Sequence, residues 1–480
     1  MSETANNALF FQRIDCNLST AALFEYFSDS PWAILLDSAN ANHCDAHVDI
    51  ICAAPIATLT TQDQISTLAH FKTPAFNSLQ NVHRKPDSVQ RFNDDPFSLL
   101  EKTLTQLFPV KKTAPFPFCG GAMGSFSYDL GRHIEHIPQT AAKDIKLPEM
   151  NVGFYAWALI FNYQEQAWYL LHYEGEAAAK ALYDELQTLL AFAPKKPTDF
   201  SLTSDWQNQI TEKEYQQKFA QVQSYLHSGD CYQINLTQRF HATYQGDEYL
   251  AYQKLRASNA APFSAFMRLP EQALLSISPE RFIQLRDEYI QTKPIKGTMP
   301  RFSDPIKDAQ SAHTLRHSIK DRAENVMIVD LLRNDLGKVA QAGSVQVPHL
   351  FDIESFPAVH HLVSTVTAKL SDDASSAQLL RAAFPGGSIT GAPKIRAMEI
   401  IEELEPSRRS LYCGSMGYLS QDGQMDTSIT IRTLVAENNQ LYCWAGGGIV
   451  ADSVAAAEYQ ESYDKVSQIL PILLGSVDLC

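Results

Sequence analysis

The chain has 480 residues and a formal net charge of −15. Hydrophobic residues make up 45% of it and charged residues 19%, a balance typical of water-soluble globular proteins with a large core. The acidic charge argues against a nucleic-acid-binding surface, and no run of about 18 apolar residues predicts a transmembrane helix.

The start of the chain and its cysteines bear on location. Residues 1–7 are polar and lack the basic and apolar segments of a secretory signal peptide. The eight cysteines include no CxxC pair, which predicts reduced thiols rather than a disulfide framework. We therefore expect a soluble cytoplasmic protein that binds neither nucleic acid nor a membrane.

Residues 1–195 are predicted to form a first domain rich in β-strands. Apolar runs at 153–161 and 167–172 predict the two strands of a hairpin, and the pattern at 176–192 predicts a helix. The glycine-rich segment 120–128 predicts a tightly packed strand. A phosphate-binding loop is not expected there, because no Lys-Ser/Thr pair follows the glycines.

Residues 196–212 are predicted to be a linker because their composition breaks from that of the flanking segments, and residues 213–475 a second domain. Thr211 and Glu214 match a capping box, in which the threonine caps a helix and the glutamate reaches back to it. We expect this helix to end near Gly229.

Later segments continue the mixture of helices and strands. A long helix is predicted over 319–335, strands over 411–420, 427–436 and 440–445, and a closing helix over 454–474. No internal repeat or low-complexity segment interrupts this pattern.

One lysine stands in unusual surroundings. Lys296 follows a strand-like run that ends at Pro294 and is itself followed by Gly297. Proline restricts the preceding residue to extended geometry, and glycine permits a close approach or an unusual backbone angle. A strand ending in a turn would present this lysine either as a desolvated nucleophile or as an ordinary surface charge.

Three glutamates lie on predicted helices. Glu324 is surrounded by apolar residues in the long helix, while Glu458 and Glu461 are three residues apart near the start of the last one. Carboxylates that meet from separate helices can hold Mg²⁺ beside an anionic substrate. Taken singly, each is more often a helix-surface charge.

Two glycine-rich segments could bind oxyanions. Segment 385–394 places backbone N–H groups before a helix, with Lys394 adding charge, and segment 445–449 predicts a second such loop. Arg432, predicted to lie on a strand, is suited to holding a carboxylate with two hydrogen bonds. Together with the glutamates, these features predict a small substrate with two carboxylates and a Mg²⁺ ion.

Several segments together resemble one family, the chorismate-utilising enzymes, which includes anthranilate, aminodeoxychorismate, isochorismate and salicylate synthases. The matching motifs occur in the family's order at 293–298, 322–336, 360–364, 385–394, 425–432 and 445–461. The resemblance implies an α+β, anthranilate synthase component I-like fold. In this chorismate-binding fold, large antiparallel sheets form a sandwich-like core flanked by helices.

The resemblance also points to one branch of the family. Lys296 stands where anthranilate synthases typically have alanine, and segment 259–266 is similar to the branch that makes 4-amino-4-deoxychorismate. Gln233 stands where the water-adding enzymes have a base lysine. Two alternatives remain open: an anthranilate synthase component I, and a chorismate-binding regulatory subunit without turnover.

The resemblance implies roles for individual residues. Lys296 is the nucleophile that forms a covalent adduct and Glu280 the general acid, while Glu324 and Glu461, assisted by Glu458, bind Mg²⁺. The residues implied to bind chorismate are Gln233, Thr298, His361, Thr390, Gly391, Tyr412, Arg432, Gly446, Gly447, Gly448 and Lys465.

The resemblance further implies partners. No amidotransferase segment is visible, so ammonia is expected from a separate glutamine amidotransferase subunit. Related synthases bind tryptophan in the first domain, which implies a possible tryptophan effector pocket. Its expected lining is Ser38, Pro262, Phe263 and Ser264.

Overall fold

The computed structural model describes residues 8–41, 43, 45–71, 85–355 and 359–474. Residues 1–7, which were predicted to lack the features of a signal peptide, lie outside this part of the chain. Within it, the architecture consists of two large antiparallel sheets with helices around them, so the predicted α+β fold class is confirmed.

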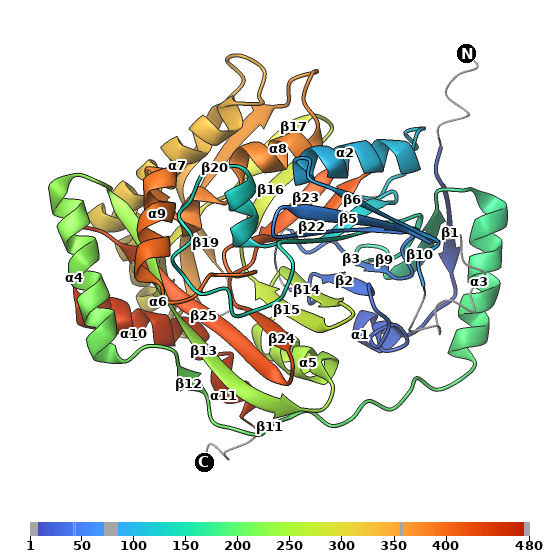
Figure 1. Cartoon of the computed structure of the whole chain (residues 1–480), viewed down its shortest axis with the longest axis horizontal. Helices are drawn as coiled ribbons and strands as arrows, with labels where there is room; N and C mark the ends of the chain where they lie inside the picture. The colour runs from blue at the N-terminus through green and yellow to red at the C-terminus, as the bar shows by residue number, and fades with distance from the viewer. Residues whose placement is uncertain (1–7, 42, 44, 72–84, 356–358, 475–480) are drawn as a thin grey trace.

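The first sheet has thirteen strands among the described residues. Its order is β1 (Phe10–Ile14), β10 (Ala167–His172), β9 (Trp157–Asn162), β3 (Val48–Cys52), β2 (Ile34–Asp37), β14 (Phe263–Arg268), β15 (Gln272–Ser278), β24 (Thr433–Glu437), β25 (Gln440–Ile449), β13 (Gln233–Gln245) and β11 (Ser201–Leu202), with β12 (Gln207–Asn208) and β21 (Gly391–Ala392) also on β13. The long strands β13 and β25 pair over ten residues and run side by side in Figure 1.

The second sheet has twelve strands within the described ranges. Its order is β18 (Ile295–Pro300), β20 (Val359–Lys369), β17 (Tyr289–Thr292), β16 (Arg281–Arg286), β23 (Met425–Ile429), β22 (Ser415–Ser420), β7 (Gly121–Phe126), β8 (Met150–Tyr155), β4 (Ala57–Gln62), β5 (Ile65–His70) and β6 (Ser88–Phe92), with β19 (Gln346–Ser355) also on β20. Strand β7 confirms the tight strand predicted in 120–128.

Helices cover the outside of the sheets. They are α1 (Thr20–Phe24), α2 (Pro96–Leu107), α3 (Glu176–Leu190), α4 (Glu212–Ser228), α5 (Glu248–Asn259), α6 (Pro305–His317), α7 (Ile319–Gly337), α8 (Ser376–Ala383), α9 (Lys394–Leu404), α10 (Ala455–Val466) and α11 (Leu470–Leu473), with 3₁₀ turns η3 (Tyr128–His133) and η4 (Gly387–Ile389). Figure 1 shows α4 and α10 together at one end of the molecule and α3 at the other.

Alternation along the strands builds the core. On β14, Ala265 and Met267 belong to a cluster shared by both sheets, whereas Phe266 between them packs outward against Phe24 of α1 and Tyr249 of α5. Successive side chains of a strand point to opposite faces, so one strand serves two cores. Each large apolar side chain buried in this way contributes about 1.5–3 kcal/mol to folding.

Both sheets run across the predicted linker. Strand β14 pairs with β2, and β22 pairs with β7, so segments from before and after residues 196–212 share each sheet. The predicted linker contains two short strands, β11 and β12, that pair with β13. The boundaries 1–195 and 213–475 stay predictions about the chain.

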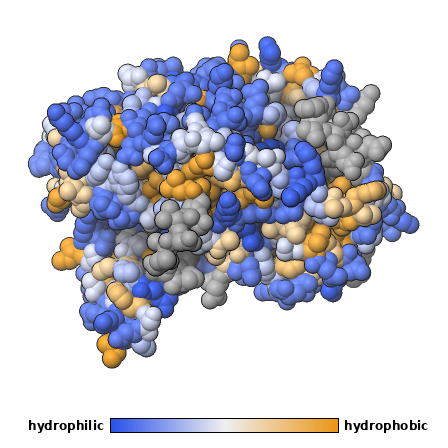
Figure 2. All heavy atoms as spheres, turned by 90° about the horizontal axis from the view of Figure 1, so that it is seen from below, coloured by the Kyte–Doolittle hydropathy of each residue, from blue (hydrophilic) through white to orange (hydrophobic). Residues whose placement is uncertain are grey.

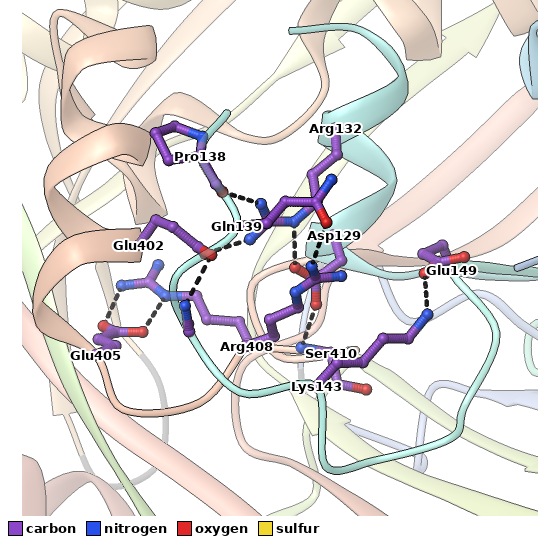
Figure 3. Close-up of polar contacts among 12 residues, drawn as sticks. Asp129, Arg132, Pro138, Gln139, Lys143, Glu149, Glu402, Glu405, Arg408 and Ser410 are labelled. Carbon is purple, nitrogen blue, oxygen red and sulfur yellow. Dashed lines mark hydrogen bonds and ion pairs between the residues drawn. The ribbon is translucent and has the colours of Figure 1, made fainter. Parts of the chain in front are cut away.

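A polar cluster fastens η3 and the segment after it to the end of α9 (Figure 3). Arg132 forms an ion pair with Glu402, which also accepts hydrogen bonds from the backbone N–H groups of Thr140 and Ala141. Asp129 accepts from the backbone N–H of Ser410 at 2.9 Å. Buried charges are stable when they are paired in this manner, so the cluster fixes the chain that continues from α9.

Local signals predicted some element ends and missed others. The capping box is present, with Thr211 Oγ1 accepting from the Glu214 N–H, and α4 is capped by Gly229 with φ of 80°. The prediction of one closing helix over 454–474 was wrong, because the chain forms α10 and α11. Pro471 lies in the first turn of α11, where its missing N–H is tolerated.

Candidate active site

A cavity of about 580 Å³ collects most of the predicted site residues. Those that line it are Glu280, Lys296, Thr298, Glu324, His361, Tyr412, Arg432, Gly446, Gly448, Glu458, Glu461 and Lys465. The four others, Gln233, Thr390, Gly391 and Gly447, are not part of the lining. The lining residues come from both sheets and from α7 and α10, so only the fold brings them together.

Glu280 and Arg432 lie where the chain crosses between the sheets. Glu280 follows β15 of the first sheet and precedes β16 of the second, while Arg432 lies between β23 and β24 on the return. The prediction that Arg432 lies on a continuous strand over 427–436 was therefore wrong. Its φ is +50°, and no glycine or proline marks this break in the sequence.

Lys296 lies in β18, at a bulge rather than in the predicted turn. The pairing register with β20 shifts between Lys296 and Thr298, and Gly297 has φ of +72°. A Cβ at Gly297 would lie 2.8 Å from Leu315 Cδ1, so glycine also allows α6 to approach. The lysine side chain is only 12% exposed, which contradicts the surface-charge alternative.

The Lys296 ammonium has two partners. Nζ lies 3.0 Å from Glu324 Oε1 and donates a hydrogen bond to the Ser388 carbonyl oxygen at 2.9 Å. Gln233 Nε2 donates to the same Glu324 oxygen at 2.6 Å. Burial alone would raise the pKa of Glu324, but Lys296 and Gln233 outweigh it and lower the pKa, which keeps this carboxyl ionised.

Glu280 is a buried carboxyl whose pKa is raised to about 6. Burial is the main cause, and Lys296 together with a hydrogen bond from Ser388 Oγ offsets it in part. A carboxyl with such a pKa carries a proton in a useful fraction of molecules near neutral pH. It is therefore suited to general acid catalysis.

Glu458 and Glu461 approach the cavity from the start of α10. A Cβ at Gly447 would lie 2.9 Å from Glu458 Oε2 and 3.1 Å from Glu461 Oε1. Burial raises the pKa of Glu458, and a hydrogen bond from Ser453 partly offsets this. Its Oε2 atom is buried and has no hydrogen-bond partner among the residues that the structure describes. Glu461 forms an ion pair with Lys465 at 2.7 Å.

Carboxylates of this kind suit a hard divalent cation, although in this structure they do not converge on a common metal position. Within the described ranges, no three His, Cys, Asp or Glu side chains are grouped closely enough to form a metal centre. The orphaned Glu458 oxygen and the space left by Gly447 nevertheless suit an additional oxygen-preferring ion.

The opposite wall is aromatic and basic. Tyr412 stacks on Trp444 with ring centroids 6.0 Å apart, and half-buried Arg432 lies near Glu280. Thr298 Oγ1 lies 2.9 Å from His361 Nδ1. Burial, reinforced by Arg432, lowers the pKa of His361 to about 4, so this imidazole is neutral at physiological pH.

Two features of the predicted oxyanion cradles were wrong. Segment 445–449 is part of strand β25, paired with β13, and not a loop. Its glycines mark a close backbone approach, since a Cβ at Gly446 would fall onto the Leu236 carbonyl. Lys394 does not line the cavity, because it is buried in an ion pair with Asp335 of α7 at 2.5 Å.

A second cavity, of about 600 Å³, contains the predicted effector residues. Ser38, Pro262, Phe263 and Ser264 all line it. Asp49 accepts hydrogen bonds from both the N–H and the hydroxyl of Ser38, each at 2.8 Å. Arg281, the neighbour of Glu280 in sequence, also lines this cavity, so one crossing segment contributes to both cavities.

Sequence reasoning missed several lining residues. Asn235, Lys320, Ser388 and Trp444 line the first cavity, and none of them was predicted. Ser388 lies within the recognised 385–394 motif, so the motif was the available signal. Asn235 and Trp444 occupy ordinary strand positions, and only the pairing of β13 with β25 brings them to the cavity.

The model of the family described as "chorismate binding enzyme" matches residues 33–471. The chain therefore belongs to the chorismate-binding enzyme family. It is 55% identical over 441 residues to aminodeoxychorismate synthase component 1 of Salmonella typhimurium, covering 92% of each chain. Its identity to the Escherichia coli protein of that name is 54% over 449 residues, covering 93% of this chain and 94% of that protein.

Solved structures agree on the fold. Anthranilate synthase component I from Streptococcus pneumoniae superposes with a TM-score of 0.76 at 29% identity, covering 89% of this chain and 93% of that one. The predicted anthranilate synthase component I-like fold is thus confirmed. In the described part of the chain, no helix is long and apolar enough to span a membrane, and the face shown in Figure 2 is mostly hydrophilic. The cytoplasmic location stays a prediction.

Proposed function

We propose that the chain is an aminodeoxychorismate synthase component 1, which converts chorismate and ammonia to 4-amino-4-deoxychorismate for para-aminobenzoate and folate synthesis. The observation that carries the proposal is the contact that Lys296 and Glu280 both make with Ser388. The Lys296 ammonium donates to the Ser388 carbonyl oxygen, and the Ser388 hydroxyl donates to the Glu280 carboxyl. A nucleophile and an acid therefore line one cavity. The names of the relatives at 54–55% identity support the same activity.

The proposed reaction uses a covalent adduct. The Lys296 nitrogen, once deprotonated, forms a bond to ring carbon C2, the ring double bonds shift, and the C4–O bond breaks. Glu280 donates a proton to the departing oxygen, which leaves as water. Ammonia then bonds to C4, the double bonds shift back, and the C2–N bond breaks to restore Lys296. Dividing a difficult displacement into two steps lowers each barrier.

The remaining lining residues bind the substrate in this proposal. Arg432 and Tyr412 would hold the enolpyruvyl carboxylate, because an arginine can bind a carboxylate through two hydrogen bonds. Neutral His361, held by Thr298, would serve as a hydrogen-bonding group rather than a charge. Gly446 and Gly448 of β25 line the cavity and would contact the substrate through their backbone, while the space for a side chain at each is filled by the Leu236 carbonyl and by Gln233 Nε2.

We also propose a Mg²⁺ requirement. Glu324 and Glu461 would bind the ion, with Glu458 as a further ligand, and their carboxylate oxygens are the donors that Mg²⁺ prefers. The bound ion would supply positive charge that neutralises the ring carboxylate of chorismate. The unpartnered Glu458 Oε2 supports this assignment.

The source of ammonia would be a second subunit. The relatives are named as component 1, which implies a second component, and we propose a glutamine amidotransferase in that role. Glutamine should then support turnover only when the partner is added. Ammonium chloride should support turnover by this chain alone.

The second cavity remains a candidate effector pocket. Its volume of about 600 Å³ and its mixture of polar and aromatic lining suit an amino acid such as tryptophan. Isothermal calorimetry with tryptophan decides the proposal. Saturable heat that disappears when Ser38 is replaced by a bulky residue supports it, and absence of heat refutes it.

A product assay tests the main proposal. The purified chain is incubated with chorismate, Mg²⁺ and ammonium, and a lyase converts any aminodeoxychorismate to para-aminobenzoate. The main alternative is an anthranilate synthase component, since Geobacillus stearothermophilus anthranilate synthase component 1 is 35% identical over 398 residues, covering 78% of each chain. Fluorescent anthranilate formed without the lyase would support that alternative. A chain that binds chorismate without turnover would instead be a regulatory subunit.

A further inference from the structure

Ser388 makes a contact with each of the two proposed catalytic groups. Its hydroxyl donates to Glu280 Oε1 at 3.1 Å, and its carbonyl oxygen accepts from Lys296 Nζ at 2.9 Å. Ser388 lies in the short 3₁₀ turn η4 and lines the cavity. One residue therefore contacts both an acid on the crossing between sheets and a lysine on β18.

The segment that carries Ser388 is fixed from behind. The carbonyl of the next residue, Ile389, accepts hydrogen bonds from Asn235 Nδ2 at 2.9 Å and from Arg409 Nη1 at 3.0 Å. Arg409 is fully buried and forms an ion pair with Glu405 at 2.7 Å. A side chain held by such a buried network keeps a defined orientation, as positioning residues require.

We infer that Ser388 is a positioning residue that aligns the Glu280 carboxyl and the Lys296 amine toward the same bound ring. This inference rests on the proposed function and extends it to a residue outside the reacting pair. The hydroxyl fixes the carboxyl, and the backbone carbonyl fixes the amine. Replacing the side chain removes only the first of these contacts, so the two roles separate experimentally.

The Glu280 carboxyl faces other charged and titratable groups that this replacement leaves in place. Lys296 of β18, Lys465 of α10 and Arg432 place positive charge near it, and Cys413 lies close as a neutral thiol. The hydrogen bond from Ser388 favours the ionised carboxylate. Losing it raises the pKa of Glu280, so the protonated acid persists to higher pH.

The Ser388→Ala variant gives a signature that simple damage does not. The alkaline limb of the kcat profile reports loss of the protonated acid. In S388A this limb moves upward by about one pH unit, while kcat falls about tenfold because the carboxyl is no longer aligned. The KM for chorismate changes by less than about twofold, since Ser388 aligns rather than binds.

The comparison uses three further variants. Ser388→Thr keeps a hydroxyl and restores the wild-type limb. Ser388→Cys keeps the volume but is a weak donor, and it replaces S388A if that variant does not fold. Thr390→Val removes a hydroxyl whose hydrogen bonds, within the described ranges, go to the carbonyls of Gly386 and Gly387. It therefore leaves the position of the limb unchanged, whatever it does to the rate.

The experiment measures lyase-coupled product formation by the full chain with Mg²⁺ and ammonium, at equal free ammonia, across about pH 5 to 9. Thermal unfolding of each variant verifies the fold. An upward shift in S388A that S388T reverses and T390V does not reproduce supports the inference. A limb that stays in place in S388A and S388C overturns it. If the wild-type protein makes anthranilate, the proposed function is refuted. The pH profiles of kcat of the variants, compared with that of the wild type, still decide the role of Ser388.

Discussion

Lys296 Nζ lies 3.0 Å from Glu324 Oε1, so the proposed nucleophile is also the counter-ion of a proposed metal ligand. Gln233 Nε2 donates to the same carboxylate oxygen at 2.6 Å. Removing one partner of a buried ion pair leaves the other charge uncompensated and costs about 3–5 kcal/mol. A substitution at Lys296 therefore has to separate chemistry from stability.

Lys296→Arg makes this separation. Arginine keeps the positive charge beside Glu324 but remains protonated and cannot attack carbon. Wild-type protein mixed with chorismate and Mg²⁺ without ammonia should gain the mass of chorismate less water, measured by intact-mass spectrometry. K296R and K296A should gain nothing and lose ammonia-dependent activity by about a thousandfold or more. If K296R gained the same mass as the wild-type protein, the nucleophile would be another residue.

Glu280→Gln tests the general acid. Glutamine keeps the volume of the side chain but cannot donate the proton that the C4 oxygen needs. We expect kcat to fall by about 10²–10⁴-fold with little change in the KM for chorismate. Steady-state kinetics with ammonium measures both values. A kcat within about threefold of wild type would exclude Glu280 as the acid.

The same substitution should stabilise the protein at alkaline pH. The pKa of Glu280 rises from 4.5 to about 6 on folding, because burial disfavours the carboxylate. The folded state thus binds the proton more tightly, and stability is lost as pH rises through about 6. The shift corresponds to about 2 kcal/mol at pH 8, which E280Q should recover, with no gain at pH 4. Urea unfolding at the two pH values measures the difference, and an equal effect at both would contradict the assigned cause.

Magnesium dependence has a readout other than activity. Chelation should abolish turnover, and adding Mg²⁺ to the chelated protein should raise its melting temperature. Glu461→Gln should weaken this response by about 10–100-fold in Mg²⁺ concentration. Glu399→Gln on α9 is the matched control, since Glu399 pairs with Arg396 and does not line the cavity. If the melting temperatures of E461Q and E399Q respond to Mg²⁺ concentration in the same way, Glu461 is not a ligand of the ion.

The sequence predicted features that depend on neighbouring residues. The capping box at Thr211 and Glu214 and the positive φ of Gly297 follow from local chemistry, and the structure has both. Twelve of the sixteen catalytic, substrate-binding and metal residues named from the resemblance line the cavity. The confirmed predictions therefore concern local geometry, and the roles of the site residues stay predictions.

The wrong predictions concern pairing between distant segments. Residues 427–436 have the apolar pattern of one strand, and only the need to pass between two sheets breaks it before Arg432. Lys394 was predicted to add positive charge to an anion-binding segment, but in the fold it forms an ion pair with Asp335 of α7. Glycines 446–448 resembled a loop because their strand role depends on β13 lying against them. Such tertiary contacts override local pattern.

Two adjacent glycines test the proposed metal site against the fold. Alanine at Gly447 would place a Cβ 2.9 Å from Glu458 Oε2 and 3.1 Å from Glu461 Oε1, which are ends of side chains that can move. Alanine at Gly446 would instead meet the Leu236 carbonyl and the Thr237 backbone, which cannot move without breaking the pairing of β13 with β25.

We therefore expect Gly447→Ala to keep its cooperative unfolding and lose its Mg²⁺-dependent rise in melting temperature. Gly446→Ala should lose about 1–3 kcal/mol of stability through overpacking. Calorimetry with and without Mg²⁺ distinguishes the two effects. If G447A responds to Mg²⁺ as wild type does, the carboxylates beside Gly447 do not bind the ion, because displaced ligands cannot retain the same affinity.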